Sequence, residues 1–182
     1  AYAWMPEGAG AGWAQTLDKL GREVMREADA PTQRSVVHAT FRIERQYPAS
    51  PARVFRALTE REAKDRWFAT SEGLTVLERS MDVRPGGRES VSGRWPNGMV
   101  STFDAVYFDV VPDTRVVYSY EMHLDTRKIS VSLATIDLRE KDGGTHLVMT
   151  EQGAFLDGYD DAGSRERGTQ FLLDALGASL TD

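Results

Sequence analysis

The chain has no cysteine, which excludes disulfide bonds, thiolate nucleophiles and zinc sites built on sulfur ligands. It also lacks any run of about 18 consecutive apolar residues, the length that a helix needs to span a bilayer. The opening residues lack the basic-then-apolar order of a secretory signal. From these absences we expect a cytoplasmic protein with no membrane span.

An excess of positive charge is missing as well. The 28 acidic residues outnumber the 22 basic ones and give a formal net charge of −6. A chain with this balance is not attracted to phosphate backbones or to anionic membranes. We therefore expect no nucleic-acid partner.

Histidine is scarce, and His38, His123 and His146 fall on three different predicted strands with no pair at metal-ligand spacing. We predict neither a metal nor a cofactor. No serine has histidine and aspartate companions that would make a hydrolase triad. The sequence shows no catalytic constellation, which favours non-enzymatic ligand binding.

The length of 182 residues and the hydrophobic content of 41% allow one domain with a core, plus an appendage. We assign residues 1–34 to an N-terminal helical extension and residues 35–182 to the domain. Within the extension, Gly12–Gly21 resembles Gly168–Gly177. Two interpretations stay open: a chance similarity between two short helices, or the remnant of the last helix of a preceding, similar domain.

The domain opens with a strand over Val36–Tyr47, where apolar and polar residues alternate in the second half. Ser50 stands directly before Pro51, and a short hydroxyl side chain ahead of a proline is typical of a helix start. This pair predicts a helix over Ala52–Leu58.

A second helix is expected over Arg61–Phe68, because Thr59 and Glu62 have the spacing of a capping box. Strand-like stretches divided by turn residues then follow. We predict six strands there: Leu74–Val83, Arg88–Trp95, Val100–Val110, Arg115–Leu124, Lys128–Arg139 and Thr145–Glu151.

The chain ends in an aromatic loop, Gly153–Tyr159, and a helix that reaches Leu180. Asp160, Asp161 and Ser164 supply the N-terminal helix signals. We attribute the acidic residues Asp157, Asp160 and Asp161 to helix capping and to complementing the helix dipole. The order predicts an α+β fold in which a curved antiparallel sheet of six or seven strands wraps around a long C-terminal helix.

The alternation of residues indicates which face of a predicted strand points into the core, and it does so for one of two strands. Tyr118, Tyr120 and Met122 alternate and must share a face, so His123 and its neighbour Glu121 lie on the opposite one. The buried side belongs to the tyrosines and the methionine. Over Lys128–Arg139 the alternation changes phase, which predicts a bulge near Val131–Ala134 and leaves the inward face of this strand open.

Five segments carry a resemblance to a known superfamily. They are Tyr47–Thr59, Arg66–Phe68, Pro85–Arg88, Val111–Tyr118 and Gly144–Glu151. Together they resemble the helix-grip superfamily of START and Bet v 1-like domains, and within it the bacterial AHSA1-like proteins of the SRPBCC group, related to the activator of Hsp90 ATPase. The resemblance covers Val36 to Leu180. One residue departs from it: a tryptophan often follows the glycine at the start of the last helix, whereas here Thr169 follows Gly168.

The resemblance implies a cavity between the sheet and the last helix that accepts small hydrophobic molecules. Aromatic side chains offer the large apolar contact that such a cavity needs, although the same residues would also fill an ordinary core. The candidates for its lining are Trp67, Phe68, Trp95, Phe103, Tyr107, Tyr118, Tyr120, Met122, Phe155, Phe171 and Leu172.

The expected function is the binding of a small hydrophobic or aromatic molecule in that cavity, with the Gly153–Tyr159 loop as its gate. Two alternatives stay open. One is a cyclase or aromatase acting on a polyketide-like substrate, and the other is an Hsp90-type co-chaperone or another interaction module. A homodimer and a chaperone partner also remain open.

Overall fold

The computed structural model describes residues 34–71 and 73–181. Its elements are β1 (Val36–Tyr47), α2 (Pro51–Thr59), α3 (Arg61–Lys64), β2 (Thr75–Met81), β3 (Arg88–Arg94), β4 (Val100–Val111), β5 (Arg115–Leu124), β6 (Arg127–Lys141), β7 (Gly144–Leu156) and α4 (Ala162–Ser179). Apart from Arg34, the expected extension over residues 1–34 lies outside the described residues and stays a prediction. No helix in the described part of the chain is long and apolar enough to cross a membrane.

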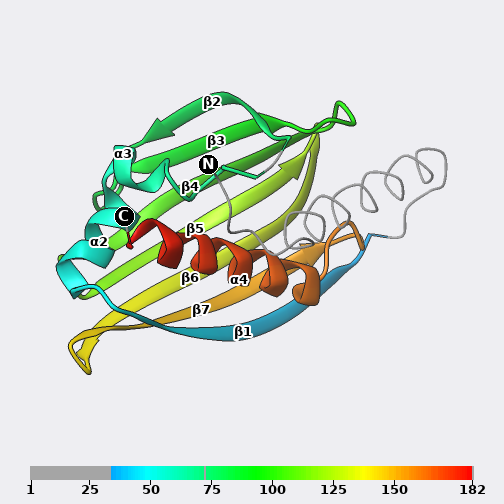
Figure 1. Ribbon diagram of the computed structural model, residues 1–182. Helices are drawn as coiled ribbons and strands as arrows, with labels where there is room; N and C mark the ends of the chain where they lie inside the picture. Colours follow the sequence, from blue (N-terminus) through cyan, green and yellow to red (C-terminus); the bar gives the residue numbers. More distant parts are fainter. Residues whose placement is uncertain (1–33, 72, 182) are drawn as a thin grey trace.

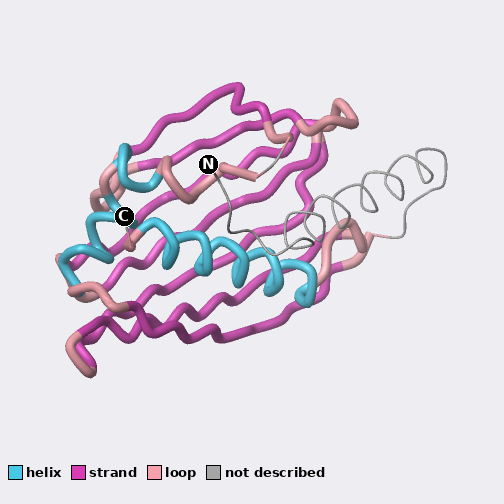
Figure 2. The backbone as a smooth tube through the Cα atoms, in the orientation of Figure 1, coloured by secondary structure: helices cyan, strands magenta, loops and turns pink. Residues whose placement is uncertain are grey.

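The seven strands form one antiparallel sheet in the order β1-β7-β6-β5-β4-β3-β2. The sheet curves strongly, and α4 crosses its concave side, while α2 and α3 lie at one end (Figure 1; Figure 2). Each strand from β2 to β6 pairs with the next one in sequence, and β1 pairs with β7 and forms one edge of the sheet. The predicted α+β fold with a curved sheet around the last helix is confirmed.

Aspartate and glycine residues form tight turns between successive strands of the meander. Between β6 and β7, Asp142 and Gly143 have φ angles of 52° and 74°. Two successive residues with positive φ make the type I′ turn whose twist matches that of the flanking strands. The turn fixes the register, so that Lys141 pairs with Gly144 and the alternate residues of both strands reach the same face.

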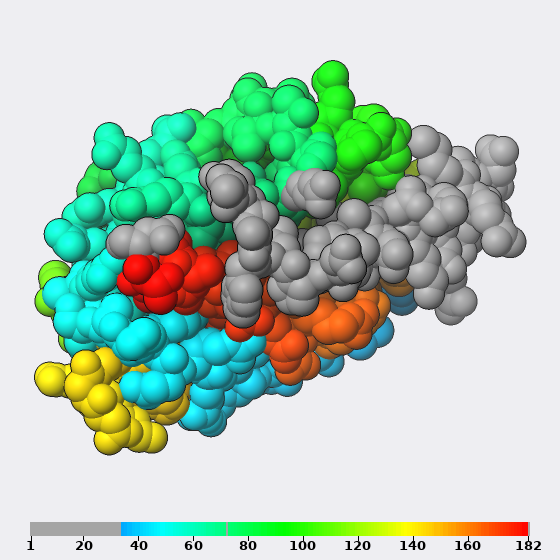
Figure 3. Space-filling model, viewed as in Figure 1, coloured from blue at the N-terminus to red at the C-terminus, as the bar shows by residue number. Residues whose placement is uncertain are grey.

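The last helix is fixed at its start and along its side. The Asp161 carboxylate accepts a hydrogen bond from the Ser164 backbone N–H at 2.9 Å, as the capping signal predicted. From β1, the Tyr47 hydroxyl donates to the Leu173 carbonyl oxygen at 2.7 Å. Gly177 lets this tyrosine ring approach, since a Cβ there would lie 2.9 Å from Tyr47 Cε1. In the space-filling view α4, orange to red, lies against the blue and cyan residues of β1 and α2 (Figure 3).

The start of α2 is as predicted, but the second helix is not. The Ser50 hydroxyl accepts a hydrogen bond from the Arg53 N–H at 3.3 Å. The capping box of Thr59 and Glu62 is wrong, because the Thr59 hydroxyl donates instead to the Phe55 carbonyl oxygen at 2.8 Å. As a result α3 spans Arg61–Lys64 only and has no side-chain cap.

The expected loop over Gly153–Tyr159 is wrong for most of its length. Strand β7 continues to Leu156, because Gly153 pairs with Ala39 of β1 on one side and with Ser132 of β6 on the other. The strand has a neighbour on both sides up to its last residues, and these two ladders outweigh the weak strand preference of Gly153 and Ala154.

The bulge expected near Val131–Ala134 is also misplaced. The alternation is regular there, with Ser130, Ser132 and Ala134 buried and Val131 37% exposed. The register shift lies earlier, opposite Met122 and His123 of β5, and leaves Ile129 unpaired in the ladder.

Candidate ligand cavity

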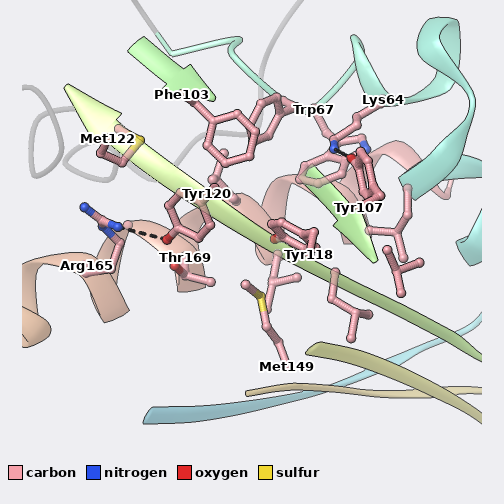
Figure 4. Close-up of a pocket in the computed structure, with 17 residues that line it drawn as sticks. Lys64, Trp67, Phe103, Tyr107, Tyr118, Tyr120, Met122, Met149, Arg165 and Thr169 are labelled. Carbon is pink, nitrogen blue, oxygen red and sulfur yellow. Dashed lines mark hydrogen bonds between the residues drawn. The ribbon is translucent and has the colours of Figure 1, made fainter. Parts of the chain in front are cut away.

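A cavity of about 150 Å³ lies between the concave face of the sheet, α4 and the residues that follow α3 (Figure 4). Most of its wall is apolar or aromatic. The residues that line it are Leu58, Lys64, Trp67, Phe68, Phe103, Tyr107, Val116, Tyr118, Tyr120, Met122, Ile136, Met149, Arg165, Gly168, Thr169, Leu172 and Leu173.

Six aromatic rings follow one another along this wall. Ring contacts run from Trp67 through Phe68, Phe103, Tyr120 and Tyr118 to Tyr107, with centroid separations of 5.0–5.9 Å. The register of the sheet brings four of them together, because β4 and β5 pair side by side and both turn alternate residues inward. Such tilted and edge-on pairs are favourable geometries for aromatic side chains.

The structure brings eight of the eleven candidate residues to this cavity. They are Trp67, Phe68, Phe103, Tyr107, Tyr118, Tyr120, Met122 and Leu172. Their role in ligand binding stays a prediction.

The other three candidates lie elsewhere. Trp95 belongs to a second small core, with Leu124 among its members, and donates its indole N–H to the Ser101 hydroxyl at 2.9 Å. Phe155 is buried on β7, and its ring centroid lies 5.7 Å from the guanidinium carbon of Arg165. Phe171 is partly exposed on α4 and does not line the cavity.

A buried ion pair stands at the α3 end of the cavity. Lys64 Nζ lies 2.7 Å from Glu89 Oε2, and the Lys64 residue is only 7% exposed. The same ammonium donates to the Tyr107 hydroxyl oxygen at 3.3 Å and stands 4.9 Å from the Phe68 ring centroid. On the other side of the carboxylate, Arg79 Nη1 lies 2.6 Å from Glu89 Oε1. Two buried cations therefore share one buried carboxylate.

The pKa shifts in this group follow from burial and charge. Burial alone would raise the pKa of the Glu89 carboxyl, but the Lys64 ammonium and the Arg79 guanidinium hold that pKa below its ordinary value. Burial lowers the pKa of the Lys64 ammonium, against the attraction of Glu89. The surroundings therefore favour the charged form of Glu89, whereas burial disfavours the charged form of Lys64.

A second polar group stands near the start of α4 and centres on Arg165. Its guanidinium donates to the Tyr120 hydroxyl oxygen at 2.9 Å and to the Ser130 hydroxyl at 2.7 Å, and it pairs with the Asp160 carboxylate. The Tyr120 hydroxyl in turn donates to Glu151 Oε1 at 2.6 Å. Here one cation faces two carboxylates.

Glu151 is the residue in this group whose hydrogen bonding is incomplete. Its Oε1 atom also accepts from the Ser132 hydroxyl at 2.8 Å, whereas Oε2 is buried with no hydrogen-bond partner among the described residues. Burial raises the pKa of the Glu151 carboxyl, although the charge of Arg165 opposes that shift. The carboxyl group therefore holds its proton to a higher pH than an exposed glutamate does.

Two hydroxyl groups among the lining residues, those of Tyr118 and Thr169, have no hydrogen-bond partner within the described chain, and both residues line the cavity. Burial raises the pKa of Tyr118 well above its ordinary value, so the phenol is neutral at any physiological pH. A molecule in the cavity could form a hydrogen bond with either hydroxyl without breaking an existing one.

Sequence reasoning missed four buried charged residues: Lys64, Glu89, Glu151 and Arg165. For the two acids a signal was present. Glu89 alternates with Val91, and Glu151 alternates with Leu147 and Met149, so each acid is in phase with buried neighbours on its own strand. An acid at such a position must have a buried partner.

We had expected all the acidic residues before α4 to cap the helix, but only one of them does. Asp161 does so, but Asp160 is buried against Arg165. Asp157 instead accepts a hydrogen bond from the Ser35 backbone N–H at 2.8 Å, at the start of β1. Capping therefore explains one of the three residues.

Comparison with known proteins identifies the family of this chain. A family model described as "Activator of Hsp90 ATPase homolog 1-like protein" matches residues 48–181. No curated protein matches the chain.

Solved structures resemble it closely. An uncharacterized protein from Rhizobium leguminosarum is 45% identical, with a TM-score of 0.79 and coverage of 82% of this chain and 99% of its own. A protein from Rhizobium loti is also 45% identical, with a TM-score of 0.74 and coverage of 80% and 99%. An AHSA1-like protein from Aeromonas hydrophila is 18% identical, with a TM-score of 0.61 and coverage of 79% and 92%, and at that identity the similarity shows the fold alone.

Proposed function

The chain belongs to the family of activator of Hsp90 ATPase homolog 1-like proteins, and from that premise we propose that it binds a single-ring aromatic molecule in the cavity beneath α4. The observation that carries the proposal is the cavity itself, about 150 Å³ in volume and walled by aromatic side chains. Close packing leaves few voids of this size in a protein interior. An apolar cavity of about this volume engineered into another protein stays dry and binds benzene.

The binding mechanism is desolvation of the ligand, with hydroxyl groups setting its orientation. Apolar surface removed from water contributes on the order of 25 cal/mol per Å². The unpartnered hydroxyls of Tyr118 and Thr169 then favour a molecule with one polar substituent over a pure hydrocarbon, because they gain a hydrogen bond in the complex.

The two alternatives gain no specific support from the site. A polyketide-like substrate of a cyclase has several rings or their precursors, whereas a volume of about 150 Å³ is near that of one ring. Activation of an Hsp90 ATPase is what the family's description names, and no contact in the cavity bears on it. We therefore keep ligand binding as the proposed function.

Thermal unfolding with phenol or toluene tests the proposal. A ligand present at about 100 times its Kd stabilises a protein by about 2.7 kcal/mol, which for a domain of this size raises Tm by roughly 5–10 °C. Thr169→Trp should abolish the shift because the indole would occupy the cavity. Ala178→Trp, at an exposed position on the same helix, is the matched control and should keep it.

Two results would overturn the proposal. One is the absence of saturable binding by the unmodified protein in both the thermal assay and NMR titration. The other is a Thr169→Trp variant that binds as tightly as the Ala178→Trp control.

A further inference from the structure

The charged side chains that line the cavity have the same sign. Among the described lining residues these are Lys64 and Arg165, both cations. The carboxylates that pair with them, those of Glu89, Glu151 and Asp160, are buried and do not line the cavity. A molecule in the cavity therefore meets ammonium and guanidinium groups first, at a place where little water screens them.

The two ends of the cavity differ in charge balance. At the α3 end, Lys64 and Arg79 share the buried carboxylate of Glu89. Arg79 also pairs with the half-exposed Asp65, which Arg61 pairs with in turn, so three cations face two carboxylates there. At the other end, Arg165 faces both Glu151 and Asp160. A further anion is thus favourable beside Lys64 and unfavourable beside Arg165, because only the first group has more cations than carboxylates.

Lys64 also has the hydrogen-bonding capacity for another acceptor. An ammonium group has three N–H donors. Two of them reach Glu89 Oε2 and the Tyr107 hydroxyl. The third can donate to a ligand, and the close-up shows the ammonium end of Lys64 beside Tyr107 at the edge of the aromatic wall (Figure 4).

The aromatic wall next to Lys64 suits a ring attached to that anion. The ammonium stands 4.9 Å from the Phe68 ring centroid, and Phe68 in turn contacts Phe103 at 5.4 Å. We infer that the ligand is a monocyclic aromatic carboxylate whose carboxylate group lies against Lys64 and whose ring lies along Phe68 and Phe103. The inference rests on the proposed function and narrows it to one class of ligand.

Three isosteric probes separate charge from shape: benzoate, benzamide and benzamidine. All three have one ring and a planar, branched substituent, and at neutral pH they are an anion, a neutral molecule and a cation. We expect benzoate to bind more tightly than benzamide by about tenfold to a hundredfold, as a charge-assisted hydrogen bond in a buried site predicts. Benzamidine should bind most weakly. Affinities are measured by calorimetry and by NMR titration of the full chain.

Lys64→Met tests where the anion lies. In this variant the ratio of benzoate to benzamide affinity should fall close to one. Lys128→Met removes the same charge from an exposed lysine that pairs with Glu121 outside the cavity, and it should keep the unmodified ratio. If Lys64→Met does not fold, the double variant Lys64→Met/Glu89→Gln, which removes both members of the ion pair, is measured in its place.

The outcomes are distinct. Benzamide binding as tightly as benzoate overturns the carboxylate assignment and leaves ligand binding intact. A preference for benzoate that survives Lys64→Met overturns the role of Lys64. Failure of all three probes and of toluene to bind overturns the proposed function together with this inference.

Discussion

Replacing Lys64 by methionine should destabilise the protein more than a typical substitution. The side chain of Glu89 would stay fully buried with one of its two cations gone. Removing one partner of a buried ion pair costs about 3–5 kcal/mol. Because Arg79 still faces Glu89 Oε1 at 2.6 Å, we expect the lower end of that range, about 3 kcal/mol. For a domain of this size that corresponds to a fall in Tm of roughly 6–12 °C.

Urea unfolding followed by tryptophan fluorescence measures this cost, with Glu89→Gln and the double variant completing a cycle. The double variant should be more stable than Lys64→Met by about 1–2 kcal/mol, since no uncompensated carboxylate remains buried. The reasoning fails if Lys64→Met costs less than about 1 kcal/mol. It also fails if the double variant loses the full sum of the two single costs, because the two groups would then not interact.

Three further predictions follow from the same contacts. Burial raises the pKa of Glu151, so its contribution to stability is fully present below the pKa of the unfolded chain and is lost as pH rises through the folded pKa. Glu151→Gln cannot ionise, and its unfolding free energy should therefore fall less than that of the unmodified protein between about pH 4 and pH 7; an equal fall would refute this. Burial lowers the pKa of Lys64, so benzoate affinity should decline with rising pH before an exposed lysine would lose its proton, while benzamide affinity stays flat in the same titration. Gly177→Ala puts a Cβ 2.9 Å from Tyr47 Cε1 and should destabilise by about 1 kcal/mol in urea unfolding, despite the better helix propensity of alanine; a more stable variant would show that the tyrosine ring moves aside.

The parts of the fold that depend on local pattern could be predicted from the sequence. Strand β5 begins and ends where its alternation indicated, and that alternation also placed Tyr118, Tyr120 and Met122 together at the cavity. The Asp161 cap marked the start of α4 correctly. In these cases the residues that decide the structure are close in sequence.

The rest depends on partners far along the chain. Lys64 is buried because Glu89 and Tyr107, on two different strands, complete its hydrogen bonds. Arg165 likewise needs Tyr120 of β5 and Ser130 of β6. No local pattern indicates which strands will lie side by side. These polar groups, whose members come from several strands and a helix, could therefore not be predicted from the spacing of residues in the sequence.

The position of β1 at the edge beside β7 has a consequence for how the domain assembles. The first strand finds its only ladder in the described sheet near the end of the chain, where Val36 pairs with Leu156 and Tyr47 with Thr145. During synthesis β1 cannot pair with β7 until nearly the whole domain has left the ribosome. Contacts so distant in sequence are slow to form. We therefore expect closure of β1 onto β7, followed by docking of α4 on Tyr47, to be a late step that limits the rate of folding.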